Sequence, residues 1–137
     1  MSREVRTQKL DSLARCLERL REKTPKDAFT LKSSADLQDI VMINLERVVQ
    51  LSVDLASILI AEKDWQPVPS TMAEAFEVLH RNGAIDEALR GRMQKSVGFR
   101  NLCVHEYDKI NWDIVFSILT KHLEDFKRFA GAMDAIP

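Results

Sequence analysis

Two side chains with the chemistry of phosphate cleavage lie close together in the last third of the chain. Arg100 and His105 are separated by four residues, and Tyr107 follows the histidine by two positions. The guanidinium of an arginine can hold a phosphate with a two-pronged, hydrogen-bonded fork. A histidine can move protons near neutral pH, because its unperturbed pKa is about 6.5. The segment therefore carries the minimum equipment for phosphodiester chemistry without a metal.

The remainder of the sequence predicts an all-α protein. Apolar residues recur at helical spacing along almost the whole chain, and strand signals are absent. Capping residues and prolines mark the expected helix limits: a first helix ending before Pro25, a long one from near Ser34 to near Lys63, a short one between Thr71 and Gly83, a fourth after Asp86 and a fifth after Asn111. The prediction is an antiparallel bundle of four longer helices plus one short helix, forming a single domain over residues 1–137.

Two of these helices carry apolar stripes that bear on packing. The long helix is apolar on more than one face around residues 48–60, which is typical of a helix buried by its own bundle and by a second subunit as well. The helix after Asn111 has one stripe, formed by Trp112, Val115, Phe116, Leu119, Leu123, Phe126 and Ala130.

The segment from Arg100 to His105 (the Arg-His segment) falls at the end of the fourth helix. Its apolar positions Leu89, Met93 and Val97, continued in steps of three or four, reach Arg100 and then Val104. This places the arginine on the stripe that faces the core or a partner. Because a charge buried alone is costly, we expect Arg100 to have a paired group or a ligand.

The angle between the two key side chains restricts how they act together. Asn101 and His105 are four residues apart and share one helix face. Arg100 and His105 are five apart, which is about 140° around an ideal helix, so one straight helix does not aim both at a single phosphate. Three arrangements remain open: the helix bends near Gly98, it ends at the histidine, or two copies of the segment meet across a dimer.

Charge provides a candidate nucleic-acid surface. The net charge of the chain is -1, so any RNA site must be a local patch. Residues 89–105 contain Arg90, Arg92, Lys95 and Arg100 and no acidic residue, as phosphate neutralisation requires. A solvated helix face would have the same composition.

Asp54 is a possible supporting residue, because it interrupts the apolar run of the long helix. Its carboxylate would pair with Arg100 or hold His105, or else face solvent or a subunit boundary.

Other classes of protein find no support in the sequence. Cys16 and Cys103 are far apart and show no metal spacing, which favours two buried thiols in a reducing cytoplasm. We therefore expect no metal site, no cofactor and a cytoplasmic location. The chain begins with charged residues, and it has no apolar run near the roughly 20 residues that span a bilayer, so we expect no membrane association.

The segment at residues 100–107 resembles the R-x4-6-H motif of the HEPN superfamily, and with its tyrosine the R-x4-H-x-Y motif of HepT-type ribonuclease toxins. The residue after the arginine is often polar in HEPN motifs, and here it is Asn101. The similarity extends over most of the chain: it includes the long helix around Asn44 to Lys63, the Trp65-Gln66-Pro67-Val68-Pro69 turn, the Glu74-Ala75-Phe76 helix and Gly98-Phe99-Arg100-Asn101.

The resemblance implies the HEPN fold and a metal-independent endoribonuclease that works by transesterification. His105 would take the proton of the ribose 2′-hydroxyl or protonate the leaving 5′-oxygen. Arg100 would stabilise the charge on the pentacoordinate phosphate. Asn101 would orient the phosphate or the histidine, and Tyr107 would bind phosphate or stack a base. HEPN ribonucleases are understood to build this site in a homodimer.

The same resemblance implies a protein partner. HepT toxins pair with a minimal nucleotidyltransferase, the MntA-type antitoxin, in type VII toxin–antitoxin systems, and that enzyme attaches AMP to the motif tyrosine. By resemblance the acceptor here would be Tyr107. The alternative is a non-catalytic HEPN protein that binds nucleotide or serves a nucleotidyltransferase as a subunit, with Arg100 acting only as a phosphate anchor.

Overall fold

The computed structural model describes residues 2–137, and this part of the chain folds into helices with no strand. The elements are α1 (Ser2–Lys23), α2 (Ala28–Lys32), α3 (Ala35–Lys63), α4 (Met72–Arg81), α5 (Glu87–His105), the 3-10 turn η1 (Tyr107–Lys109), α6 (Trp112–Ser117), the π-helical turn η2 (Ile118–His122) and α7 (Leu123–Ala135). The predicted all-α fold is confirmed. No helix in residues 2–137 combines the length and apolar character that a membrane crossing requires.

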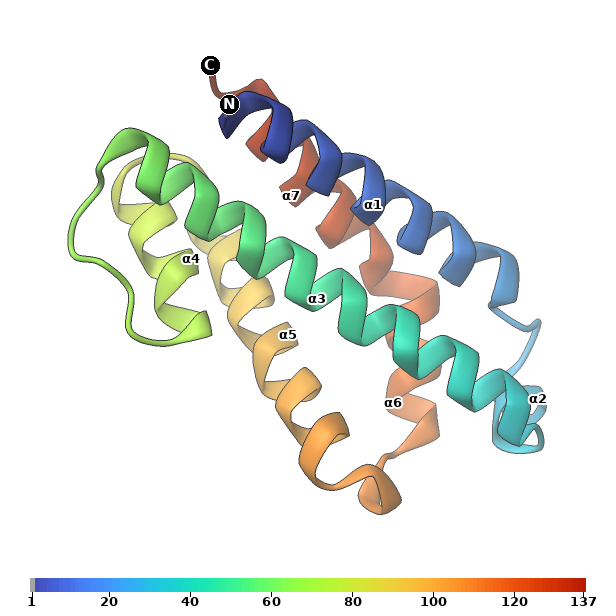
Figure 1. Ribbon diagram of the computed structural model, residues 1–137. Helices are drawn as coiled ribbons and strands as arrows, with labels where there is room; N and C mark the ends of the chain where they lie inside the picture. The colour runs from blue at the N-terminus through green and yellow to red at the C-terminus, as the bar shows by residue number, and fades with distance from the viewer. Residues whose placement is uncertain (1) are drawn as a thin grey trace.

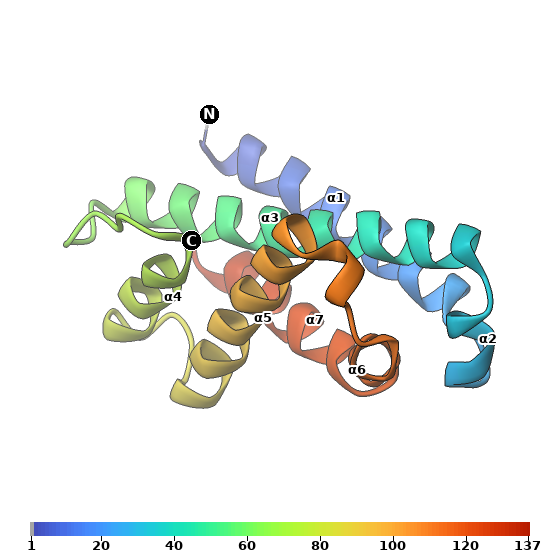
Figure 2. The same cartoon turned by 90° about the horizontal axis from the view of Figure 1, so that it is seen from below.

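Helix α3 is the centre of the bundle. It packs against α1, and its other sides contact α4, α5 and α7. Figure 1 shows α1 and α3 running side by side in opposite directions. In the view from below, α1 and α3 lie in the upper part of the picture and α4, α5, α6 and α7 extend beneath them (Figure 2). The chain itself therefore covers more than one apolar face of α3, and this pattern needs no second subunit to explain it.

Local hydrogen bonds set the starts of the main helices where the sequence predicts them. The side chains of Ser34, Asp86 and Asn111 each accept hydrogen bonds from backbone N–H groups in the first turns of α3, α5 and α6. These N–H groups have no partner inside the helix, so a capping oxygen stabilises each start. The cap at Asp86 fixes where α5 begins, and α5 carries the Arg-His segment.

The last helix contains a π-helical turn that the sequence did not predict. The π-helical turn separates α6 from α7, and within it the Thr120 hydroxyl donates to the carbonyl of Phe116 at 3.0 Å. Such back-bonding competes with the regular backbone ladder and distorts helices. The apolar stripe nevertheless reaches the core on both sides of the turn, since Val115, Leu119 and Phe126 are all buried. The short α2 was also not predicted.

An arginine joins the first and last helices to α3. Arg6 is only 1% exposed, its Nη2 lies 2.7 Å from Glu62 Oε1, and its Nη1 donates to the Met133 carbonyl at 2.9 Å. A buried guanidinium requires a paired charge and further acceptors, and it has both. This bridge holds α1, α3 and α7 together on the side away from the Arg-His segment.

Candidate active site

Helix α5 ends at His105. The backbone N–H of Glu106 closes the last turn by donating to the Leu102 carbonyl at 2.8 Å, and the chain then enters η1 with Tyr107. Of the three arrangements left open by the sequence, the helix ending at the histidine is therefore present. The side chain of His105 is exposed at this end, and it forms no hydrogen bond or ion pair with another residue in 2–137.

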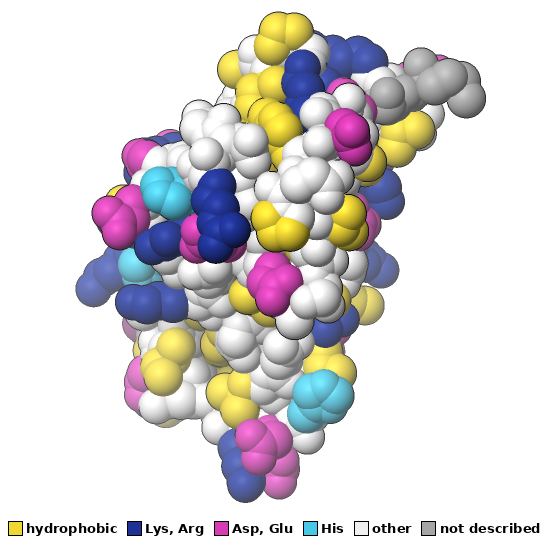
Figure 3. Space-filling view, turned by 90° about the vertical axis from the view of Figure 1, so that its left-hand side faces the viewer, with side chains coloured by type: hydrophobic (Ala, Val, Ile, Leu, Met, Phe, Trp, Pro, Cys, Tyr) yellow, Lys and Arg dark blue, Asp and Glu magenta, His cyan; other side chains and the backbone are white. Residues whose placement is uncertain are grey.

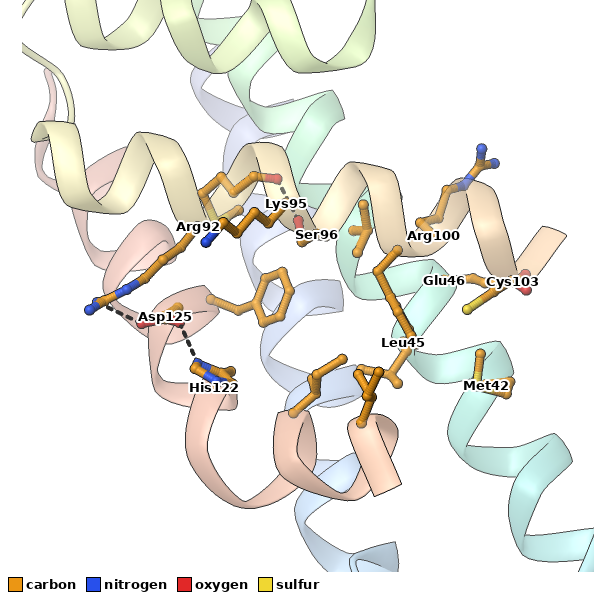
Figure 4. Close-up of a pocket in the computed structure, with 16 residues that line it drawn as sticks. Met42, Leu45, Glu46, Arg92, Lys95, Ser96, Arg100, Cys103, His122 and Asp125 are labelled. Atoms are coloured by element: carbon orange, nitrogen blue, oxygen red, sulfur yellow. Dashed lines mark hydrogen bonds and ion pairs between the residues drawn. The ribbon is translucent and has the colours of Figure 1, made fainter. Parts of the chain in front are cut away.

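Arg100 lies at the edge of the core. Its side chain is half-buried and its Nε is enclosed without a partner, while Nη1 donates to Asn101 Oδ1 at 3.3 Å. Figure 4 shows the guanidinium pointing away from the hollow that its stem lines. Of the paired group or ligand that the sequence predicts for this charge, an ion-pair partner is absent within residues 2–137. The guanidinium points outward, where water or a ligand can hydrogen-bond to it.

The sequence predicted that the buried stripe of α5 continues to Val104, but in the structure it does not. Leu89, Met93, Val97 and Cys103 are buried, whereas Val104 is 45% exposed. Cys103 lines the hollow between α3, α5 and the α6–α7 region, so the face of α5 that carries Cys103 is the one that is covered there. Val104, within the Arg-His segment, faces solvent.

Tyr107 is held by a residue that the sequence did not single out. Its hydroxyl donates to Asp39 Oδ1 on α3 at 3.1 Å, and its ring meets the edge of Trp112 with centroids 6.2 Å apart. Burial raises the pKa of the Tyr107 phenol above its ordinary value, and the hydrogen bond and negative charge of Asp39 act in the same direction. Asp39 is one of several polar residues near the start of α3, and no sequence signal connects it with a tyrosine 68 residues away.

Asp54 does not support the site within this chain, which corrects the sequence-based possibility. Its carboxylate accepts from Lys9 at 3.3 Å and from Gln50 at 3.0 Å. The reason is the direction of this face of α3: it points toward α1, whereas α5 packs on another face. Asp54 therefore joins two helices away from Arg100 and His105.

The basic residues earlier in α5 differ from Arg100. Arg90 is paired with Glu77 at 3.0 Å and with Glu87 at 3.5 Å, and Arg92 is paired with Asp125 at 3.2 Å. Lys95 is exposed and has no ion pair in residues 2–137. On the face drawn in Figure 3, basic and acidic side chains are intermixed and do not form one positive patch. Much of the charge predicted for RNA binding is thus neutralised within the chain.

A hollow of about 370 Å³ lies beside the segment, between α3, α5 and the α6–α7 region. Apolar side chains, Phe99 and Phe126 among them, form most of its wall. At one end Asp125 accepts from both Arg92 and His122, and these two contacts appear as dashed lines in Figure 4. His122 is the last residue of the π-helical turn η2.

The cysteines have no role as nucleophiles. Burial, followed by the nearby charge of Glu46, raises the pKa of the Cys103 thiol to about 12, and burial also raises the pKa of Cys16. Both thiols therefore stay neutral near pH 7. Within residues 2–137 no group of three or more His, Cys, Asp or Glu side chains is placed to hold a metal ion.

Comparison with known protein families gives a match over most of the chain. The model of the family described as "Ribonuclease HepT-like" matches residues 11–133. The chain belongs to the HepT-like ribonuclease family. The resemblance read from the sequence motifs is confirmed, and this HepT-like protein is an enzyme of the ribonuclease class.

Relatives of this HepT-like ribonuclease are similar along nearly their whole length. The mRNA nuclease HepT of Shewanella oneidensis is 32% identical over 127 residues, which are 93% of this chain and 94% of that protein. A solved structure of the tri-AMPylated HEPN toxin of Shewanella oneidensis in complex with the MNT antitoxin matches with a TM-score of 0.89 at 30% identity, covering 96% of this chain and 98% of that one. A toxin–antitoxin structure with AMP-PNP matches with a TM-score of 0.87 at 29% identity, covering 94% and 97%.

Proposed function

We propose that the protein is a metal-independent endoribonuclease and the toxin of a type VII toxin–antitoxin pair. In this proposal Arg100 and His105 form the catalytic pair, Asn101 supports them, and Tyr107 is the position at which a nucleotidyltransferase antitoxin attaches AMP. The membership of the HepT-like ribonuclease family supports the class of reaction, and the contacts at the end of α5 support the choice of residues.

The observation that carries the proposal is a contrast along one helix. Arg90 and Arg92 are held by carboxylates of the same chain, but Arg100 has only the neutral side chain of Asn101 beside it. An arginine with its head exposed and no counter-ion is ready to bind a phosphate through charge-assisted hydrogen bonds. His105, the exposed histidine five residues later, is equally free.

The reaction is an internal displacement at phosphorus. The ribose 2′-oxygen forms a bond to the adjacent phosphorus, and the bond to the 5′-oxygen of the next nucleotide breaks. His105 accepts the 2′-hydroxyl proton or donates one to the departing 5′-oxygen. Arg100 stabilises the negative charge that grows on the phosphate oxygens in the transition state. The products are a 2′,3′-cyclic phosphate and a 5′-hydroxyl.

A second copy of the chain supplies the missing half of this chemistry in our proposal. One histidine cannot serve as acid and base at the same moment, and the angle between Arg100 and His105 separates them on α5. Three apolar side chains near them are exposed: Leu102 at 36%, Val104 at 45% and Ile114 at 53%. In a homodimer these side chains would be covered, and the two Arg-His segments would face one cleft.

Control by AMP at Tyr107 follows from its position and from the relatives. Tyr107 is the only tyrosine of the chain, it is 43% exposed, and it directly follows the end of α5. The HEPN toxin of Shewanella oneidensis has been solved in a tri-AMPylated form with its MNT antitoxin. An added nucleotide brings bulk and negative charge to the place where RNA phosphate would bind.

The test uses the purified protein, free of any antitoxin, and a short single-stranded RNA. The protein should cut the RNA and leave a 2′,3′-cyclic phosphate. The matched control replaces the single ribose at the cleavage point with deoxyribose, which removes the attacking hydroxyl and should abolish cutting there. Cleavage of the deoxy-substituted strand at the same bond would exclude the transesterification mechanism.

A further inference from the structure

The hydroxyl of Tyr107 has one protein partner within hydrogen-bond distance in residues 2–137. It donates to Asp39 Oδ1 at 3.1 Å, and this bond joins η1 to α3 across 68 residues of chain. Both side chains are exposed, so the contact can be reached from solvent by another protein.

The tyrosine is held from two directions. The edge-on contact between its ring and Trp112, with an interplanar angle of 72°, limits rotation of the ring. The Asp39 carboxylate fixes the other end by accepting the phenolic hydrogen. With the hydrogen directed at Asp39, a lone pair of the phenolic oxygen is left directed away from the carboxylate.

We propose that Asp39 is the proton acceptor that prepares Tyr107 for nucleotidyl transfer. This inference rests on the proposed modification of Tyr107. As the phenolic oxygen of Tyr107 forms its bond to the α-phosphorus of a nucleoside triphosphate, the bond from that phosphorus to pyrophosphate breaks. The phenolic proton passes to Asp39 Oδ1, and the tyrosine is left as a phosphodiester of AMP.

Tyr107 needs a proton acceptor for this reaction, because its phenol is rarely ionised near neutral pH. A phenol has an ordinary pKa of about 10, so little phenolate is present near neutral pH. Burial and the Asp39 charge raise the pKa of Tyr107 further, which makes the phenolate scarcer still. The proton must then leave while the new bond forms, and Asp39 already touches it. The negative charge of Glu46 also raises the pKa of Tyr107, without a hydrogen bond to this hydroxyl.

The contact with Asp39 also explains why the AMP-modified side chain of Tyr107 would move away from α3. A tyrosine that carries AMP has no hydroxyl hydrogen to donate, and its phosphate is negatively charged. Once Asp39 has released the transferred proton to water, its carboxylate would repel this phosphate. The modified Tyr107 side chain would therefore move away from Asp39.

The experiment follows AMP addition by intact mass, with the purified protein, ATP and the nucleotidyltransferase antitoxin of the proposed pair. Asp39→Asn keeps the size of the side chain and removes its basicity, so initial AMP addition should slow by about 10²-fold or more. Asp39→Glu should recover part of the rate. Asp36→Asn, an exposed carboxylate one turn earlier on α3, serves as the matched control and should react as the parent does. Circular dichroism verifies that each variant is helical.

A pH series separates proton transfer from a structural role. Without an acceptor, the Asp39→Asn variant can react only through its phenolate, so its rate should rise about tenfold per pH unit below the phenol pKa. The parent should show a flatter profile. A variant that was merely misfolded would stay slow at every pH, and this result would overturn the inference.

Failure of the inference and failure of the proposed function give different results. If the parent protein gains AMP, Tyr107→Phe gains none, and Asp39→Asn reacts at the parent rate, Asp39 is not the acceptor although Tyr107 is still the modified residue. If the parent gains no AMP, or if Tyr107→Phe gains it equally, modification of Tyr107 is wrong and the role of Asp39 is excluded with it.

Discussion

The guanidinium of Arg100 lies 3.3 Å from the side-chain oxygen of Asn101, the next residue in the chain. This neutral contact orients the arginine but leaves its charge uncompensated, whereas Arg92, eight residues earlier, is neutralised by Asp125. The difference explains why we assign the phosphate to Arg100.

Arg100→Ala and His105→Ala should each lower RNA cleavage by about 10²–10⁴-fold, the usual range for loss of a general acid or base and near that for loss of a charge-stabilising donor. The measurement is the initial rate of cleavage of a labelled RNA. Arg21→Ala and His122→Ala are matched controls, since both side chains are exposed and lie outside the proposed catalytic pair. A His105→Ala protein that cuts as fast as the parent would falsify the ribonuclease site.

Cleavage should proceed unchanged in excess EDTA, because Arg100 and His105 between them supply charge stabilisation and proton transfer. The rate before and after chelation is the measurement, with a magnesium-dependent nuclease as the control for complete chelation. Loss of activity that magnesium restores would show that a metal carries part of the reaction.

The protein should be a dimer, and the dimer should be required for cleavage. Val104→Glu places a charge on the exposed apolar surface next to His105, and it should lower both the molar mass measured by light scattering and the cleavage rate. Val68→Glu is the matched control, since Val68 is 72% exposed in the loop between α3 and α4. A fully active monomer at micromolar concentration would contradict the shared site.

The phenol of Tyr107 should titrate above the usual range for tyrosine, because burial and Asp39 both disfavour the phenolate. As the only tyrosine, it can be followed by its own absorbance during alkaline titration. A raised pKa in the folded state stabilises the fold below the unfolded value of about 10, and this contribution is lost as the pH rises through the folded value. Asp39→Asn should lower the pKa of Tyr107, and an unchanged titration curve would show that the hydrogen bond is not formed in solution.

Features that depend on neighbouring residues could be predicted from the sequence, whereas those that depend on packing could not. The starts of α3 and α5 were predictable, because Ser34 and Asp86 bond to N–H groups three residues ahead. The Tyr107–Asp39 bond depends on how η1 meets α3, which no local pattern encodes. The prediction that Val104 is buried was wrong for the same reason. Helical spacing shows which residues share a face of α5, but it does not show which face the neighbouring helices cover.

The π-helical turn at Ile118–His122 has a consequence for how the chain tolerates changes in length. Deleting a residue from an α-helix rotates everything after it by about 100° and moves its apolar face out of the core. A π turn already contains about one residue more than an α turn, so it resembles an insertion absorbed into a regular helix. Removal of Thr120 would convert the turn toward ordinary helix and keep Val115 and Phe126 on the same side. The region beside the hollow is therefore where this bundle can lose a residue and keep its core, at the expense of the position of His122.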